Sequence, residues 1–331
     1  MDYLKLFDTH AQYNDFVGVG GMLRPNVSYC IQENEVHYND VLNPLIAKFN
    51  VTSTASTKHL YTDFYQYLAT DLFNKIEVDG TEISLTELNS NGGVYNDMAQ
   101  GEHIVKYYLK NEEVMSYGMF IYCDGIVEIT IPKTVKTIED EIMQGTNITS
   151  LIIPDNVNTI GNQAFAGCGY LTAVTVGTGF EYDGGYGLFL NCPLTTVSLN
   201  VKRITNDLME IFNSETITSI TFGDNTEIID NWALSTFNRR PMLTSVTIGN
   251  NVSTIGNYGF SGCVSLSSIT IPQSVVSIGE HAFSDCNELS SITFLSNTLS
   301  IGDYAFCECS NLNTASRNAI SAINPIALEC E

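Results

Sequence analysis

Leu266-Ser-Ser-Ile-Thr-Ile-Pro-Gln-Ser-Val-Val-Ser-Ile-Gly-Glu-His-Ala-Phe-Ser-Asp-Cys286 decides the fold, because the same pattern returns along the chain at a fixed spacing. Equivalent stretches begin 23 residues apart, except for one step of 22 and one step of 26 residues. Such a constant spacing does not arise by chance, so the sequence predicts a protein built from stacked repeats. The repeats begin at Ile126, Ile148, Leu171, Leu194, Ile217, Leu243, Leu266, Leu289 and Leu312.

Each repeat opens with alternating apolar and small polar residues, as in Ser268-Ile-Thr-Ile271. A period of two with β-branched residues indicates a strand with one buried face. Position n is the residue n places after the first residue of a repeat, and positions 3 and 5 are apolar from the repeat of Ile148 to that of Leu289. A second short strand is predicted before the Gly at position 13, as in Val252-Ser-Thr-Ile-Gly256. Position 17 predicts an internal column of large apolar side chains, formed by Phe165, Leu188, Ile211, Leu234, Phe260, Phe283 and Phe306.

A single repeat cannot fold alone. It buries about six apolar side chains at roughly 1.5–3 kcal/mol each, whereas ordering costs about 1.5 kcal/mol per residue. Stacking supplies the difference, because each repeat covers its neighbour's open face and pairs with its strand edge. Three repeats depart from the pattern. The repeat from Leu171 contains Glu181-Tyr-Asp-Gly-Gly-Tyr-Gly187, the repeat from Leu194 lacks the Ile-Gly pair, and the repeat from Ile217 has three extra residues near 238–241.

The repeats, above all the one from Leu266 to Cys286, resemble the BspA-like leucine-rich repeats of gut and oral bacteria. The resemblance covers roughly residues 120–331. It implies a solenoid that is used for adhesion or for binding to proteins. It implies no catalytic residues and no cofactors.

The N-terminal third has no such repeat. Asn26-Val-Ser-Tyr-Cys-Ile31 and Glu35-Val-His-Tyr-Asn39 resemble a leader on repeat proteins of gut Bacteroidales and their phages, which implies an attachment segment. Alternating runs at 47–52, 73–78 and 103–109, with the hairpin signal Asp79-Gly80, predict a small antiparallel β-domain. Residues 63–73 are also compatible with a short amphipathic helix.

The sequence therefore predicts a mainly β protein in three parts. Residues 1–43 form an N-terminal attachment segment, and residues 44–115 form a small antiparallel, sandwich-like β-domain. Residues 116–331 form a leucine-rich-repeat solenoid with a parallel sheet, of about eight repeats. A truncated repeat from Leu312 is expected to cap the far end, since repeat arrays need capped ends.

The net charge limits the kinds of molecule that the protein is expected to bind. The chain has 14 Lys and Arg against 37 Asp and Glu, a net charge of −23. Such a chain repels phosphate backbones, so we expect no nucleic-acid partner. The sequence has no run of about 18 apolar residues, so we expect no membrane insertion. Residues 1–8 lack the basic and apolar regions of a signal peptide.

No catalytic, cofactor-binding or metal-binding motif stands out. Cys307-Glu-Cys309 has no second ligand pair at zinc spacing, and disulfides are not expected without a secretion signal. For His281, in a variable position of its repeat, we expect an ordinary surface role. Four cysteines stand at position 20 of their repeats, which predicts that they form a buried row of small side chains: Cys168, Cys263, Cys286 and Cys309.

Irregular loops on a repeat scaffold are where we expect a partner to bind. Tyr, Trp and Arg are favoured interface residues. The predicted partner-binding residues are Tyr182, Tyr186, Trp232, Arg239 and Arg240. The alternative is that these repeats have decayed and that Trp232 packs beneath its own loop.

We expect a non-enzymatic binding or adhesion protein that meets protein or glycan on a cell surface. The leader and the missing signal peptide favour a virion-associated phage protein, attached to virion structural proteins through its N-terminal segment. The alternative is a bacterial cell-surface adhesin of BspA type.

Overall fold

The computed structural model describes residues 44–51, 58–61, 68–95, 98–182, 184–212, 215–235 and 242–330. Nearer the N-terminus it describes only the backbone of β1 (Leu6–Phe7) and β2 (Cys30–Ile31), which pair in parallel. Contacts divide the chain into the units Met1–Pro44 and Leu45–Glu331. The predicted attachment segment, residues 1–43, therefore lies outside the described residues apart from those two strands.

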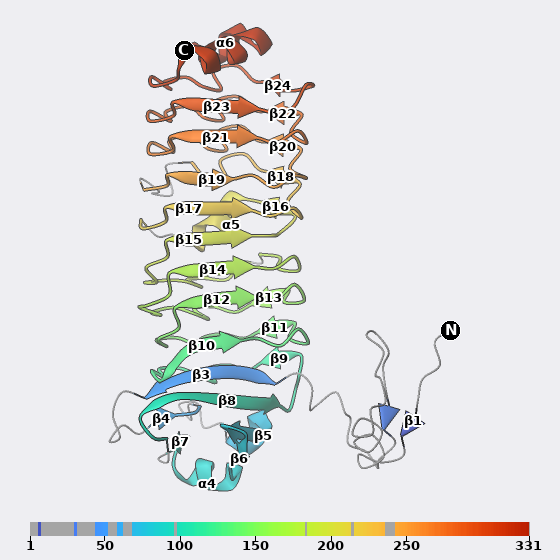
Figure 1. Ribbon diagram of the computed structural model, residues 1–331, viewed down its shortest axis with the longest axis vertical. Helices are drawn as coiled ribbons and strands as arrows, with labels where there is room; N and C mark the ends of the chain where they lie inside the picture. Colours follow the sequence, from blue (N-terminus) through green and yellow to red (C-terminus); the bar gives the residue numbers. More distant parts are fainter. Residues whose placement is uncertain are drawn as a thin grey trace, which may run out of the picture. The chain divides into compact units, whose positions relative to one another are not determined.

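One strand from each repeat forms the first row of the solenoid, and the strands stack in chain order (Figure 1). From β12 to β19, and again from β21 to β23, neighbouring strands pair with position 3 beside position 3, for example Val174 beside Leu151 and Val197. The predicted register and parallel sheet are confirmed. Side chains at positions 3 and 5 are buried, and those at positions 2 and 4 face outward. The strands are β10 (Ile126–Thr130), β12 (Ser150–Ile153), β14 (Ala173–Val176), β15 (Thr196–Leu199), β17 (Ser219–Phe222), β19 (Ser245–Thr247), β21 (Ser268–Ile271) and β23 (Ser291–Phe294).

A second row of two-residue strands runs beside the first. It falls into two parts, because the repeat from Leu171 contributes no strand to it. The first part holds β9 (Val114–Met115), β11 (Thr137–Ile138) and β13 (Thr159–Ile160). The second part holds β16 (Arg203–Ile204), β18 (Ile228–Ile229), β20 (Thr254–Ile255), β22 (Ser277–Ile278) and β24 (Ser300–Ile301). The short helix α5 (Asn206–Glu210) follows β16.

Gly occupies position 13 because neighbouring repeats leave no room for a side chain there. A Cβ atom on Gly279 would lie 2.6 Å from the amide nitrogen of Asn257, closer than real Cβ atoms come to other atoms. A Cβ atom on Gly302 would lie 2.5 Å from the amide nitrogen of Glu280. Any larger residue at these positions would push two repeats apart.

Side chains at position 14 link the turns of successive repeats through hydrogen bonds. The Asn257 amide N–H donates to Oδ1 of Asn231 at 2.8 Å, and the Glu280 amide N–H donates to Oδ1 of Asn257 at 2.9 Å. Each bond runs from a backbone donor to a short side chain one repeat earlier. The turn is thus held to its neighbour by the same contact, repeat after repeat.

Aromatic rings form the predicted internal column at its C-terminal end. Phe260, Phe283 and Phe306 are buried, and their rings stack with centroids 4.9 and 5.2 Å apart. The near-parallel offset geometry adds about 0.5–1.5 kcal/mol per pair to the gain from burial. A second set of stacked rings lies nearer the N-terminal end of the solenoid and begins with Phe165.

Two irregular repeats place a different residue in this column than predicted. The ring of Phe189 stacks on Phe165 at 5.6 Å and on Phe212 at 5.2 Å. Both residues stand at position 18, so assigning Leu188 and Ile211 to the column was wrong. The Gly-rich segment of one repeat and α5 in the next shift the alignment of these repeats by one residue. Position 18 therefore takes the place of position 17 in the column.

Buried cysteines bridge successive turns. The Cys286 thiol donates to the Phe260 carbonyl at 3.2 Å, and the Cys309 thiol donates to the Phe283 carbonyl at 3.0 Å. The hydrogen bond with Cys309 and burial raise the pKa of Cys286 well above its usual value. The thiol therefore stays protonated and remains a donor. The predicted buried row at position 20 is confirmed, and Cys192, at position 21, joins it.

An antiparallel sheet lies at the start of the second unit, in the order β10-β3-β8-β5-β6. Its strands are β3 (Leu45–Val51), β5 (Phe73–Val78), β6 (Thr81–Glu82) and β8 (Gly101–Leu109). The predicted hairpin turn is confirmed, since Asp79 and Gly80 have φ of 50° and 82° and join β5 to β6. Because β3 pairs with β10, this sheet continues into the first repeat (Figure 1).

Short elements accompany this sheet. They are the helices α3 (Ala69–Leu72) and α4 (Leu85–Ser90) and the paired strands β4 (Lys58–His59) and β7 (Val94–Tyr95). Of the segment 63–73, compatible in sequence with a helix, residues 69–72 are helical and residues 63–67 lie outside the described residues. The sandwich-like arrangement expected for 44–115 stays a prediction, because parts of that segment are not described.

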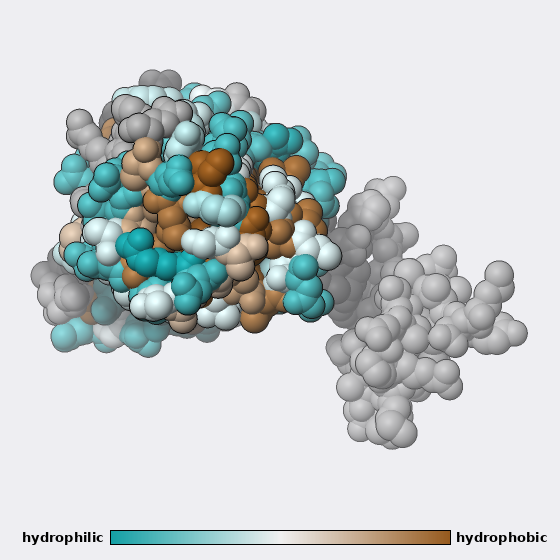
Figure 2. Space-filling view, turned by 90° about the horizontal axis from the view of Figure 1, so that it is seen from above, coloured by the Kyte–Doolittle hydropathy of each residue, from teal (hydrophilic) through white to brown (hydrophobic). Residues whose placement is uncertain are grey.

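The C-terminal end is covered by α6 (Thr314–Ile323) and the 3-10 turn η2 (Pro325–Leu328). Ile320 and Ala327 are fully buried, and the Phe306 N–H donates to the Ala327 carbonyl at 2.8 Å. Figure 2 looks onto this end and shows apolar residues gathered near its middle. None of the described helices has the length and hydropathy needed to cross a bilayer.

A disulfide joins Cys307 to Cys330, with Cα atoms 5.1 Å apart. We expected none, so that prediction was wrong. Both residues stand at position 18 of consecutive repeats, which places their side chains side by side once the repeats stack. The bond ties the segment after η2 to the last full repeat.

Truncating Phe283 to Ala should lower the free energy of unfolding by about 3–5 kcal/mol, because a fully buried ring leaves a cavity. Urea unfolding followed by circular dichroism measures this. The exposed Ser268→Ala change in the same repeat is the control and should stay within about 0.5 kcal/mol. An equal effect of the two changes would mean that the repeat register is misplaced.

Replacing both Cys307 and Cys330 by Ser should lower the free energy of unfolding by about 3 kcal/mol, because the crosslink constrains the unfolded chain. The same urea experiment, run with and without a reductant, should show a matching loss for the unmodified chain. Peptide mapping under non-reducing conditions should recover the linked pair. Recovery of both residues only as free thiols contradicts the assignment.

Candidate functional site

The outward-facing side chains of the first strand row form a single uncharged surface, which we call the hydroxyl face. Twelve of its fourteen residues are Ser or Thr, and none carries a charge. It consists of positions 2 and 4 in seven repeats: Ser150, Ile152, Ala173, Thr175, Thr196, Ser198, Ser219, Thr221, Ser245, Thr247, Ser268, Thr270, Ser291 and Thr293. In a chain with a net charge of −23, an uncharged face of this length is unusual.

A ladder of hydroxyl groups at position 1 borders this face and fixes its geometry. The Thr195 hydroxyl donates to the Thr172 carbonyl, and the Thr218 hydroxyl donates to the Thr195 carbonyl, each at 3.2 Å. Thr244 repeats the bond to the Thr218 carbonyl at 3.2 Å. Since these side chains are already bonded, a partner would meet a preformed surface.

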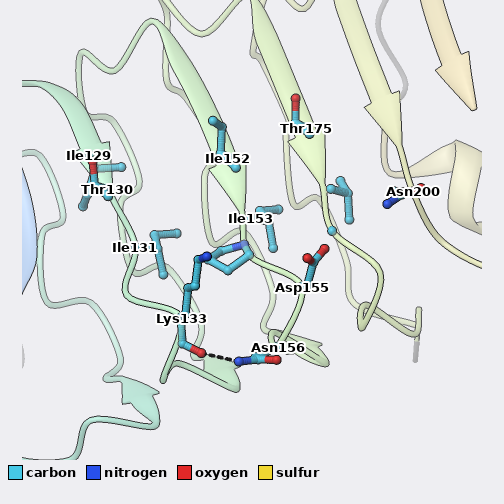
Figure 3. Close-up of a pocket in the computed structure, with 13 residues that line it drawn as sticks. Ile129, Thr130, Ile131, Lys133, Ile152, Ile153, Asp155, Asn156, Thr175 and Asn200 are labelled. Carbon is cyan, nitrogen blue, oxygen red and sulfur yellow. Dashed lines mark hydrogen bonds between the residues drawn. The ribbon is translucent and has the colours of Figure 1, made fainter. Parts of the chain in front are cut away.

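A groove of about 450 Å³ interrupts the hydroxyl face at the ends of β10, β12 and β14 (Figure 3). We call it the Ile152 groove, and it is lined by residues 129–131, 133, 152–156, 175–177 and 200. Ile152 is the one large aliphatic residue of the hydroxyl face, and 66% of its surface is exposed. The groove thus offers an apolar contact among hydroxyl groups.

Two opposite charges stand at the turn end of the Ile152 groove. Lys133 and Asp155 both occupy position 7, in consecutive repeats, and both line the groove (Figure 3). Asp155 is held in place, because its Oδ1 accepts the Thr178 N–H at 2.9 Å. The Asn156 side chain donates to the Lys133 carbonyl and joins the two turns.

A second groove of about 350 Å³ lies on the same face three repeats from the C-terminal end. It is lined by residues 244–248, 250, 268–270, 272 and 295, and Leu295 is 54% exposed there. Neither groove has an aromatic residue in its lining. The hydroxyl face therefore suits shape-based contact by a macromolecule better than ring stacking.

A row of rings occupies position 15, on the turn after the second strand row. Trp232 stacks on Tyr258 at 3.9 Å, Tyr258 on His281 at 4.7 Å, and His281 on Tyr304 at 5.3 Å. All four residues have φ between 52° and 63°, a region that bulky residues rarely adopt. Because the rings cover one another's faces, the row presents mainly ring edges to solvent.

This row corrects two expectations about single residues. Trp232 packs on the next repeat instead of beneath its own loop, and His281 is a half-buried member of the stack instead of an ordinary surface residue. The sequence signal was present, since the four residues recur at one position of successive repeats.

The structure does not bring the predicted partner-binding residues together into one site. Tyr182 is partly buried against the core and its hydroxyl donates to the Gly185 carbonyl at 3.2 Å, whereas Tyr186 is 66% exposed. Trp232 lies two repeats away and is 41% exposed. Arg239 and Arg240 lie outside the described residues. Their roles in binding stay predictions.

One group of potential metal ligands comes together among the described residues. It consists of Cys307, Glu308 and Cys330. Both sulfur atoms are joined in the disulfide, so neither is a thiolate that could bind a metal in this state.

Comparison with known proteins bears on the repeats. The model of the BspA type leucine rich repeat region matches residues 108–210 and 208–329, with six copies of the repeat. No curated protein matches the chain.

Solved structures give a weaker likeness. A leucine-rich repeat protein from Bacteroides ovatus is 22% identical, with a TM-score of 0.31, over 61% of this chain and 69% of that one. A leucine rich cell surface protein from Faecalibacterium prausnitzii is 24% identical, with a TM-score of 0.35, over 63% and 59%. The T. pallidum leucine rich repeat protein is 20% identical, with a TM-score of 0.37, over 59% and 78%.

Proposed function

Because the chain belongs to the BspA-type leucine-rich repeat family, we propose that it is a non-enzymatic binding protein of the bacterial cell surface. We further propose that the hydroxyl face is the surface that its partner covers. The observation that carries this proposal is the face itself: seven stacked repeats present mostly short, uncharged side chains at positions 2 and 4, beside two grooves.

The energetics of burial favour this face over the rest of the surface. Burying a charged group against a partner costs far more than burying a hydroxyl group, which can exchange its water for a new hydrogen bond. Most of the chain's surplus of Asp and Glu lies elsewhere, so the hydroxyl face is where a partner meets the least electrostatic opposition. Ile152 and Leu295 add apolar contacts within the two grooves.

The disulfide supports a location outside the cytoplasm. Cytoplasmic thiols are kept reduced, whereas disulfides persist in extracytoplasmic compartments. The pair Cys307–Cys330 closes a loop at the end of the solenoid, where its reduction would loosen the cap. A cell-surface protein would keep this bond.

The alternative to a cell-surface protein is that the chain is a virion-associated phage protein. It is motivated by the resemblance of residues 26–39 to a phage-associated leader, and these residues lie outside the described ones apart from the backbone of β2. That alternative stays a prediction. Mass spectrometry of purified particles from the source would detect the chain if it is correct.

Intact source cells treated with a membrane-impermeant biotin reagent should yield the biotinylated chain. A photo-reactive benzoylphenylalanine at Thr175, where the hydroxyl face borders the Ile152 groove, should then crosslink to a second macromolecule on those cells. Immunoblotting for a shifted band measures the adduct. The matched control places the same residue at the exposed Glu210 of α5, where we expect no adduct.

Two outcomes contradict the proposal. Biotinylation no greater than that of a cytoplasmic marker would exclude display on the cell surface. Crosslinking at Glu210 equal to that at Thr175, or none at either, would exclude the hydroxyl face as the binding surface.

A further inference from the structure

The second strand row is broken at the repeat from Leu171. β13 ends one part of the row and β16 begins the next, so each has a strand partner on one side only. The sequence between them explains the break, because Gly184 and Gly187 take φ of 99° and 65°, which a strand does not allow. The described residues of 181–187 form no strand, and we call this stretch the bulged segment.

A pocket of about 380 Å³ lies beside this break. Its floor is apolar, formed by Phe180, Val201 and Leu208, which are all buried. Tyr182 forms one wall and comes from the bulged segment itself. The volume falls within the usual range for small-molecule sites, about 300–1,000 Å³.

Two cations and two carboxylates stand at the rim: Lys202, Arg203, Glu181 and Glu227. Among the described residues from 137 to 316, Lys202 and Arg203 are the only cations. Within that described part of the solenoid, the pocket is therefore where positive charge meets the surplus of carboxylates.

Ion pairs hold these rim groups in place. Lys202 Nζ lies 3.5 Å from a carboxylate oxygen of Glu227. The Arg203 guanidinium donates two hydrogen bonds to Asp230, the Nη2 bond being 2.7 Å long. The hydrogen bonds to Asp230 raise the pKa of Arg203. Donors and acceptors are thus fixed around an apolar floor before any ligand arrives.

We propose that this pocket binds a neutral saccharide unit, which deepens the proposed cell-surface binding function and rests on it. A sugar ring has an apolar face of C–H groups that fits against Tyr182 and the floor. Its hydroxyl groups both donate and accept, so they donate to the carboxylates of Glu181 and Glu227 and accept from the ammonium group of Lys202.

Other ligand classes satisfy the pocket less well. An anion meets two carboxylates, and a cation meets two basic side chains. A purely apolar ligand would remove the rim charges from water without offering them a hydrogen bond in return, which is unfavourable. An extended peptide also has donors and acceptors, but its backbone has no apolar ring face to cover Tyr182.

The test is an array of neutral, acidic and sulfated saccharides probed with the purified full chain, followed by calorimetric titration of the saccharides that bind. We expect binding among the neutral saccharides. Tyr182→Ala should weaken the affinity about tenfold, equivalent to about 1.4 kcal/mol. Tyr170→Ala is the matched control, because Tyr170 is an exposed tyrosine of the same repeat region and does not line the pocket, so this variant should keep its affinity.

Tyr182 contacts the core, so a second variant guards against misfolding. Lys202→Ala removes a cation whose side chain is 72% exposed, and it should weaken saccharide binding about tenfold with an unchanged melting temperature. Lys136→Ala removes an ion-paired lysine whose side chain is 52% exposed and which lines neither the pocket nor the two grooves, so it should leave binding intact. Absence of neutral-saccharide binding, preference for acidic saccharides, or equal effects of the paired variants would overturn the proposal. Since the purified chain is used, these outcomes are independent of its display on cells.

Discussion

Backbone contact between equivalent positions of successive repeats is the interaction on which the rest of the structure depends. At position 13 the two chains come so close that Gly279 has no room for a Cβ atom beside Asn257. That approach lets the side chain at position 14 reach the next backbone N–H and lets the position 17 rings stack. The same contact aligns the outward side chains, and a continuous hydroxyl face follows from it.

Departures from the repeat create the features that a regular stack lacks. Where the Gly-rich segment replaces a second strand, the row breaks and a pocket opens beside β16. Where Asp230 replaces Gly at position 13, its carboxylate binds Arg203 in the repeat before it. The regular repeats thus supply a stiff scaffold, and the irregular ones supply chemical variety.

The sequence predicted the strand register well, because a 23-residue period with buried positions 3 and 5 allows only one alignment. It misplaced Phe189 and Phe212, since a one-residue shift within an irregular repeat cannot be seen from the period. It missed the disulfide because location was argued from the N-terminus, although the shared position of Cys307 and Cys330 was a usable signal. Tyr182 could be placed in an irregular segment from the sequence, but its neighbours from other repeats could be identified only from the structure.

The most direct test of tight stacking compares two variants, Gly279→Ala and Gly169→Ala, and measures the free energy of unfolding of each. A Cβ atom on Gly279 would meet the backbone of the preceding repeat, whereas one on Gly169 would meet nothing within 4 Å. The account predicts a loss of about 1–3 kcal/mol for Gly279→Ala, and no loss, or a small gain, for Gly169→Ala. Equal unfolding free energies for the two variants would contradict it.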